Sequence, residues 1–295
     1  MSTDAVVIWG ELLWDRFLEP SAEGGDQRGG APANVAWHLG QAGGWAQLVT
    51  RVGDDDDGRR AIAQLADVVD TQLVQIDPTR ATGEVTVRLE NGEPRYTLHA
   101  GRAWEAIAWT PDVARAIAEA GVFVFGTLAQ RTAEGLASWR TAVAAAKRCL
   151  RVCDLNLRPT DQNAPAIAEA LDAADLLKLN DRELGALRDW FGWSDPLTKL
   201  RERPRTIAIT HGAGGSTLYG EGDPIEIPAQ RAEPGGDNVG CGDAYLAILV
   251  HGMTLGWDLE TSGRAASRWA AAVAGHRGAT PSFSDDQIAQ LLEVA

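Results

Sequence analysis

Short apolar runs alternate with longer segments of helical periodicity along most of the chain. The apolar runs predict buried strands at Ala5–Trp9, Gln47–Val52, Val122–Phe125, Arg151–Leu155, Leu176–Leu179 and Thr206–Thr210. The segments between them predict helices at Ala31–Leu39, Arg59–Ala66, Pro111–Ala120, Ala133–Arg148, Pro165–Ala174 and Asp181–Trp190. Because this alternation requires crossover connections, it predicts an α/β fold with a doubly wound, mainly parallel sheet flanked by helices. No linker divides the chain, so we expect one domain over residues 1–295.

Two segments depart from this rhythm. From Gly242 onward the pattern is helical, and it predicts helices at Asp243–Gly256, Thr261–Gly275 and Ser284–Val294 with no further strong strand. Val85–Leu89 and Arg95–Leu98 instead alternate with period 2 around a turn at Glu90–Glu93, which predicts an antiparallel hairpin off the main sheet. From the pattern alone, this hairpin is either a solvent-exposed flap or a lid over a site.

Composition excludes several classes of partner. The formal net charge of −14 argues against nucleic acid or an anionic membrane, since both require a basic surface. No apolar run of transmembrane length is present. Three scattered cysteines do not make a disulfide framework, and the first residues lack the basic start of a signal peptide. We therefore expect a cytoplasmic protein.

Several phosphate- and metal-binding motifs are absent. No Gly-Lys dipeptide occurs, which excludes a P-loop, and the signature set of protein kinases is missing. The acidic run Asp54–Asp57 lacks the register of an EF-hand, because Gly53 and Gln64 would occupy its first and last ligand positions. We expect this run to be a solvated loop.

A glycine-dense loop at 235–243 leads directly into a predicted helix. Gly240 and Gly242 allow successive backbone N–H groups to point at one anion, and the helix N-terminus adds partial positive charge. Asp243, in the first turn, is either a favourable helix-terminal charge or a general base for a hydroxyl that attacks a bound phosphate. A second glycine pair, Gly29 and Gly30, precedes Pro32 and Asn34; it is either a tight turn into a helix or a close backbone approach to a ligand.

Together these two loops resemble the signatures of the ribokinase-like, PfkB-type carbohydrate kinases, and fructokinases in particular. The G-G-A-P-A-N stretch at 29–34 resembles the family's N-terminal signature, and the stretch at 237–243 resembles its D-T-x-G-A-G-D signature. In order along the chain, further stretches resemble other family motifs: G-E-x-x-x-D at 10–15, V-G-x-D at 52–55, D-x-N-x-R at 154–158, N-x-x-E at 180–183 and T-x-G-x-x-G at 210–215. The resemblance extends from Gly10 to about Ser282.

The resemblance implies roles for individual residues. Asp243 would be the catalytic base, and the backbone of Gly240, Cys241 and Gly242 would form an anion hole. The sugar would be bound by Asp15, Gly29, Gly30, Asn34, Tyr96 and Arg158. ATP would lie near Asn180, Glu183, Thr210, Gly212 and Gly215, with Glu183 organising Mg²⁺ through water. Asp237 and the carbonyl of Val239 would hold a monovalent cation such as K⁺, and segments 11–29 and 82–101 would form a small β lid.

Three features depart from the family pattern. Asn238 and Cys241 replace the usual threonine and alanine of the second signature, and the stretch between Asp15 and Gly29 is short. Ala266–Ala270 lacks an asparagine that often lines the adenine pocket in the family. Because the implied anion hole is made of backbone, we expect activity to survive the changes at Asn238 and Cys241. The short stretch between Asp15 and Gly29 implies that this side of the lid is abbreviated.

The resemblance favours an ATP-dependent sugar kinase, with a fructokinase as the leading assignment. Kinases of ribose, ketodeoxygluconate or a nucleoside remain as alternatives within the family, and a catalytically inactive sugar-binding regulator remains outside it. The expected partners are a small-molecule sugar and ATP, with a homodimer among the oligomeric states to test.

Overall fold

The computed structural model describes residues 5–17, 25–90, 93–157, 163–203 and 205–293. Its centre is a nine-stranded sheet in the order β13-β12-β11-β10-β9-β8-β1-β4-β5. The neighbouring pairs from β11 through to β5 are parallel, whereas β12 pairs antiparallel with both β11 and β13. The predicted doubly wound, mainly parallel sheet is therefore confirmed. Its strands are β1 Ala5–Trp9, β4 Trp45–Gly53, β5 Val74–Asp77, β8 Val122–Phe125, β9 Leu150–Asp154, β10 Leu176–Asn180, β11 Thr206–Thr210, β12 Ser216–Tyr219 and β13 Ile225–Ile227.

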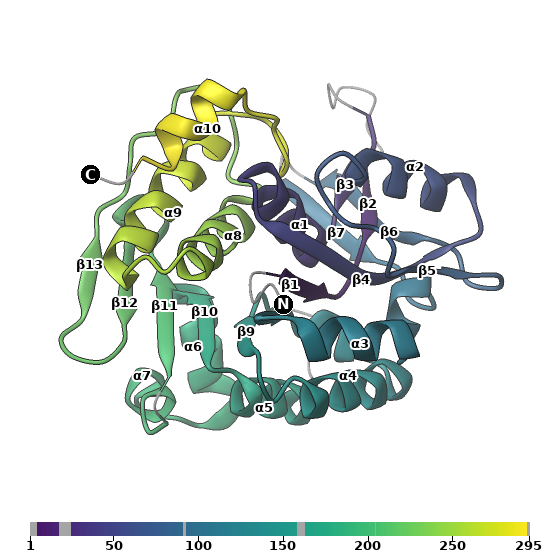
Figure 1. Cartoon of the computed structure of the whole chain (residues 1–295), viewed down its shortest axis with the longest axis horizontal. Helices are drawn as coiled ribbons and strands as arrows, with labels where there is room; N and C mark the ends of the chain where they lie inside the picture. The colour runs from purple at the N-terminus through teal and green to yellow at the C-terminus, as the bar shows by residue number, and fades with distance from the viewer. Residues whose placement is uncertain (1–4, 18–24, 91–92, 158–162, 204, 294–295) are drawn as a thin grey trace.

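Helices cover both faces of this sheet (Figure 1). Along β1, Val6 and Ile8 belong to one buried cluster, and Val7 and Trp9 belong to another, because successive strand residues point to opposite faces. The first cluster includes residues of α1 Ala31–Gln41, α2 Asp56–Leu65, α8 Cys241–Thr254 and α9 Leu259–Ala274, with α10 Asp285–Leu291 packed beside them. The second includes residues of α3 Pro111–Glu119, α4 Ala133–Ala145, α5 Ala164–Ala173, α6 Asp181–Phe191 and α7 Pro196–Leu200.

A smaller sheet of four strands lies apart from the main one. Its order is β3-β2-β6-β7, formed by β2 Leu13–Phe17, β3 Gln27–Gly29, β6 Gly83–Glu90 and β7 Glu93–Leu98. β6 and β7 pair antiparallel, which confirms the predicted hairpin, although two residues of its predicted turn (91–92) lie outside the described part. All four strands fall within the segments 11–29 and 82–101.

The expectation that the acidic run is a solvated loop is only partly correct, because Asp54 and Asp56 are exposed but the run leads into helix α2. Asp55 is the N-cap of α2 and accepts a hydrogen bond from the Gly58 amide, and Asp56 and Asp57 form the first turn. Acidic side chains stabilise this end of a helix because they interact favourably with its dipole. Asp57 also pairs with Arg16 of β2, so the run connects the smaller sheet to the body of the molecule.

The sequence pattern also missed several short elements. The strands β2, β3, β5, β12 and β13 and the helix α7 have three to five residues each, too few to establish a period. Trp14 of β2 is 1% exposed; Arg60 lies over its ring, and its Nε1 donates to the Asp57 carbonyl. No helix in the described ranges has the length and apolar character needed to cross a membrane.

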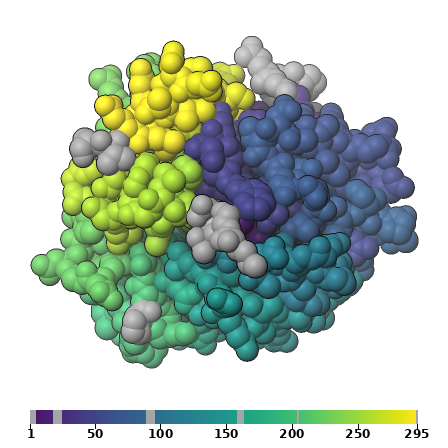
Figure 2. Space-filling model, viewed as in Figure 1, coloured from purple at the N-terminus to yellow at the C-terminus, as the bar shows by residue number. Residues whose placement is uncertain are grey.

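Segments far apart in the sequence meet on one face of the molecule. In Figure 2 the purple N-terminal part, the yellow-green α8–α9 region and the teal α3–α5 region adjoin near the centre of the view. Contacts between α1 and α8 hold the first and last thirds of the chain together.

Candidate active site

The candidate site lies where the N-termini of α1 and α8 meet above the carboxyl ends of the parallel strands. Asn34, in the first turn of α1, donates a hydrogen bond from Nδ2 to Oδ2 of Asp243, in the first turn of α8, over 2.8 Å. These two residues are 209 positions apart in the sequence. The structure thus brings the two glycine-rich loops singled out by the sequence into one place.

The N-terminus of α8 has no side-chain cap. Helix α8 begins at Cys241, two residues earlier than predicted, so Cys241, Gly242 and Asp243 are its first three residues. Gly240 is the N-cap, in the left-handed conformation at φ 75°, and has no side chain with which to cap these amides. The turn can therefore present backbone N–H groups and the positive end of the helix dipole to an anion.

Charged side chains are buried behind this turn. Lys178 of β10 donates from Nζ to both carboxylate oxygens of Asp154 at the end of β9, at 3.0 and 3.2 Å. Burial alone would lower the pKa of Lys178, but the nearby carboxylates of Asp154, Glu183 and Asp243 outweigh burial and raise it. The lysine is therefore a fixed cation.

The N-x-x-E motif forms a capping box at the start of α6. Asn180 Oδ1 accepts from the Glu183 amide at 3.0 Å, and Glu183 Oε2 accepts from the Asn180 amide at 2.8 Å. The other oxygen, Glu183 Oε1, accepts from the Leu157 amide at 2.8 Å. Burial raises the pKa of Glu183, while Lys178 opposes the shift. Glu183 thus joins two strand ends, and each oxygen keeps a lone pair for a water molecule.

The predicted nucleotide turn lies between β11 and β12. Thr210 ends β11, and Gly212 begins a short 3₁₀ turn, largely open to solvent, whose C-cap is Gly215. His211 anchors it, with Nδ1 2.8 Å from Asp181 Oδ1 and Nε2 2.9 Å from Thr217 Oγ1. Because Asp181 is the first residue of α6, the turn lies beside the Asn180–Glu183 motif.

The predicted sugar-binding residues lie on the smaller sheet and the start of α1. Asp15 is on β2, its carboxylate against the backbone of Gly29 on β3; a Cβ at Gly29 would lie 2.6 Å from Asp15 Oδ2. Gly30 is the N-cap of α1. Tyr96 is on β7 with its side chain 63% exposed, and Arg158 lies outside the described residues.

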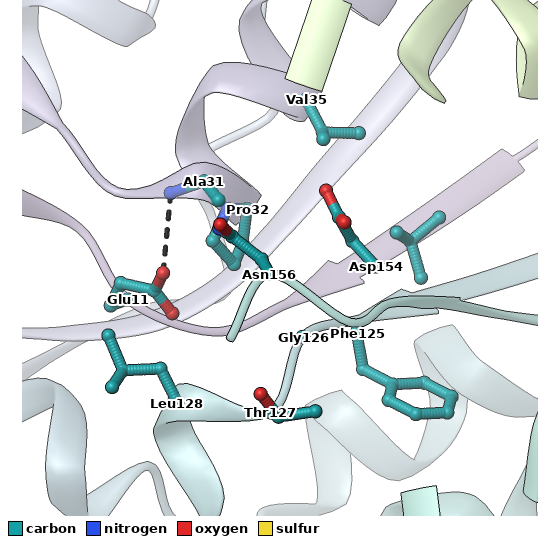
Figure 3. Close-up of a pocket in the computed structure, with 11 residues that line it drawn as sticks. Glu11, Ala31, Pro32, Val35, Phe125, Gly126, Thr127, Leu128, Asp154 and Asn156 are labelled. Atoms are coloured by element: carbon teal, nitrogen blue, oxygen red, sulfur yellow. Dashed lines mark hydrogen bonds between the residues drawn. The ribbon is translucent and has the colours of Figure 1, made fainter. Parts of the chain in front are cut away.

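Figure 3 shows a small pocket, partly open to solvent, beside the start of α1. Its polar lining comes from Glu11, Thr127, Asp154 and Asn156. Glu11 is buried and accepts from the Ala31 amide at 3.3 Å. Asn156 is the one described non-glycine residue with positive φ, at 38°, which marks a constrained backbone.

Sequence reasoning did not assign these polar residues or Lys178 to the site. Glu11, Asp154 and Asn156 lie inside motifs that resemble those of the family, and Lys178 is a single charge in an apolar strand. These two features of the sequence could have identified the residues as part of the site.

Asp237 and Val239 lie in the loop before α8. Asp237 Oδ1 accepts from the Val239 amide at 2.9 Å, and its Oδ2 accepts from the Gly278 amide at 3.1 Å. The carboxylate therefore connects this loop to the segment after α9. Within the described ranges, no group of three or more His, Cys, Asp or Glu side chains is arranged to hold a metal ion.

Known proteins resemble this chain in sequence and in fold. The chain is 28% identical to the uncharacterized sugar kinase PH1459 of Pyrococcus horikoshii, over 96% of this chain and 94% of that protein. It is 27% identical to fructokinase-1 of Oryza sativa, over 99% of each chain. The structure superposes on a fructokinase with bound ATP from Xylella fastidiosa with a TM-score of 0.88 and 21% identity, covering 98% of each chain.

The family profile described as pfkB family carbohydrate kinase matches residues 19–286. This match covers most of the chain and includes both glycine-rich loops and the strand ends that position them. The protein is therefore a sugar phosphotransferase with a ribokinase-like fold, and it belongs to the pfkB family of carbohydrate kinases.

Proposed function

We propose that this protein transfers the γ-phosphoryl group of ATP to a hydroxyl of a sugar, with fructose as the preferred acceptor. The Asn34–Asp243 hydrogen bond carries the proposal, because it joins the side-chain amide of one glycine-rich loop to a carboxylate at a helix N-terminus that has no side-chain cap. Fructokinases among the relatives support fructose as the acceptor.

Asp243 acts in this proposal as the general base. The acceptor hydroxyl oxygen attacks the γ-phosphorus, its proton passes to the Asp243 carboxylate, and the bond from phosphorus to the bridging oxygen of ADP breaks. The N–H groups at Gly240, Cys241 and Gly242 stabilise the charge on the phosphoryl oxygens. The competing explanation is that Asp243 serves only as a stabilising charge at the helix N-terminus.

The sugar would be held between the smaller sheet and α1. Asp15 and Asn34 supply polar groups, Gly29 and Gly30 allow close approach, and Tyr96 and Arg158 complete the set. The strands of the smaller sheet belong to segments 11–29 and 82–101, the segments that the family resemblance assigns to the lid. In this proposal the smaller sheet acts as a lid within the single domain, and its closure excludes water from the reaction.

ATP and Mg²⁺ fit the other half of the site. ATP-bound structures of related kinases, one with Mg²⁺, support ATP as the phosphoryl donor. In this proposal the nucleotide lies along Thr210, Gly212 and Gly215. Asn180 and Glu183 would organise Mg²⁺ through water, which suits an ion that retains much of its hydration shell. Mg²⁺ supplies charge neutralisation on the phosphates, and the protein residues orient them.

A monovalent cation such as K⁺ would bind at Asp237 and the Val239 carbonyl. The two backbone contacts of Asp237 hold its carboxylate in one orientation beside the anion-hole loop, as such a site requires. A cation there would fix the shape of the loop.

A coupled assay of ADP release tests the proposal across fructose, ribose, glucose, ketodeoxygluconate and adenosine. We expect fructose to give the highest kcat/KM, and stimulation by K⁺ relative to tetramethylammonium. A tenfold higher kcat/KM for ribose or adenosine would overturn the fructose assignment, and absence of ADP release with any acceptor would favour a sugar-binding regulator. Equal rates in the two buffers would exclude the K⁺ site.

A further inference from the structure

Lys178 is a buried cation in a strand that is otherwise apolar. Its neighbours on β10, Leu176, Leu177 and Leu179, are fully buried, and Lys178 itself is 5% exposed. Removing an ammonium group from water is costly, so such a lysine requires a compensating partner. A leucine at this position would satisfy the strand pattern, which leaves the lysine unexplained by packing.

The partner of Lys178 is Asp154, and the geometry holds the ammonium in one place. Nζ contacts Oδ1 at 3.0 Å and Oδ2 at 3.2 Å, and Asp154 is itself buried. An ammonium group has three N–H donors, and this contact to one carboxylate leaves at least one of them for another direction. Glu183 and Asp243 also interact favourably with the lysine charge.

The ammonium lies against the first turn of α8. A Cβ atom on Gly242 would be 2.8 Å from Lys178 Nζ, closer than real Cβ contacts allow. Gly242 has no Cβ, so its backbone approaches the ammonium directly. This is the same backbone whose N–H groups face the phosphoryl group in the proposed mechanism.

We propose that Lys178 is a positioning residue for phosphoryl transfer: held by Asp154 behind the Gly240–Gly242 turn, it adds a fixed positive charge to the anion hole. This inference rests on the proposed function. A positive charge in a water-poor site stabilises negative charge more strongly than it does in water, and a buried, paired ammonium needs no rearrangement during the reaction. The competing explanation is that Lys178 only neutralises Asp154.

Three variants separate these explanations: Lys178→Met, Asp154→Asn and the double variant. Removing one partner of a buried pair is strongly destabilising, whereas removing both is often tolerated, so the double variant keeps the test interpretable if Lys178→Met does not fold. Lys199→Met is the matched control, because Lys199 pairs with Glu202 on the surface at 2.7 Å. For each variant we measure melting temperature, kcat, sugar KM and the Kd of Mg-ADP with and without aluminium fluoride and fructose. The fluoride complex mimics the phosphoryl group in transfer.

We expect the double variant to recover melting temperature but not catalysis. Its kcat should fall by about 10- to 100-fold, below the loss for a direct oxyanion donor, and its affinity for the aluminium fluoride complex should fall by a similar factor. Sugar KM and the Kd of Mg-ADP alone should change less than threefold. Asp154→Asn, which keeps the cation, should lose less affinity for the complex than the double variant, and Lys199→Met should match the wild type.

Two results would overturn the assignment. If the double variant binds the aluminium fluoride complex with an affinity within threefold of the wild type, Lys178 only neutralises Asp154. An equal loss in Asp154→Asn and the double variant would assign the effect to Asp154. Failure of the proposed function is distinguishable, because the wild-type protein itself would then release no ADP with any sugar.

Discussion

Replacing Asp243 by asparagine tests the proposed base with little change in shape. In the structure Asn34 Nδ2 lies 2.8 Å from Asp243 Oδ2. Asparagine at position 243 retains a side-chain oxygen that can accept this hydrogen bond, but it cannot take a proton from the acceptor hydroxyl. General-base catalysis contributes about 10²–10⁴-fold, so we expect kcat to fall by about that factor. This corresponds to about 3–5 kcal/mol of transition-state stabilisation.

The effect on stability should be much smaller. Loss of a negative charge in the first turn of α8 costs about 0.3–1 kcal/mol, and weakening one charge-assisted hydrogen bond costs about 1 kcal/mol more. The sum of about 1–2 kcal/mol corresponds to a fall in Tm of several degrees in a protein of this size. The expected loss of transition-state stabilisation, about 3–5 kcal/mol, is therefore larger than the expected loss of folding stability.

The assay is ADP release at saturating fructose and ATP, with sugar Kd and Tm measured on the same preparations. Asn34→Ala is the matched control: it removes the same hydrogen bond from the other side but leaves the carboxylate, so it should raise sugar KM more than it lowers kcat. The reasoning is refuted if Asp243→Asn retains more than a tenth of wild-type kcat. That result would leave Asp243 as a helix-terminal charge only.

Two further predictions concern titratable groups. Burial lowers the pKa of His38 to about 4, with a smaller opposing effect from its contact with Ala279 O. Between pH 6.5 and 4 the unfolded chain therefore binds a proton at this residue and the folded chain does not. The free energy of unfolding should fall by about 3 kcal/mol from pH 6.5 to 4. Chemical denaturation across this range should show a shallower slope for His38→Gln than for the exposed control His276→Gln, and equal slopes would contradict the assignment. Burial, with Asp237 and Asp243, raises the pKa of Cys241 to about 11, so alkylation by iodoacetamide should be slow at pH 8 and accelerate toward pH 11. Mass spectrometry checks this, and labelling at pH 8 as fast as that of free glutathione would count against it.

The elements that could be predicted from the sequence are those with a repeating local pattern. The strands at Ala5–Trp9 and Thr206–Thr210 were placed with their observed bounds, because a buried parallel strand is a continuous apolar run between helices. The hairpin of β6 and β7 was predicted from its period of two. Short strands with polar residues, such as β3 at Gln27–Gly29, had no period to detect, since their pairing with β2 supplies the hydrogen bonds that define them.

The candidate site was predictable only as a set of motifs. The glycine pairs and the N-x-x-E motif are local, because a turn, a helix cap or a close backbone approach depends on residues a few positions apart. The pairing of Arg16 with Asp57 was not predictable in this way, because the two residues are 41 positions apart and belong to separate elements.

The sequence by itself determined the fold class, the glycine-rich turns and the residue types available for chemistry, because periodicity and turn preferences act over short stretches of chain. Only the tertiary structure decided which of those residues meet. Packing of α1 against α8 brings Asn34 to Asp243, and Lys178 of β10 lies against Gly242 of α8. The pairing of β9 with β10 puts Asp154 at hydrogen-bond distance from the lysine. These contacts depend on how separate strands and helices pack in three dimensions, and the free energy of that packing is a property of the whole chain.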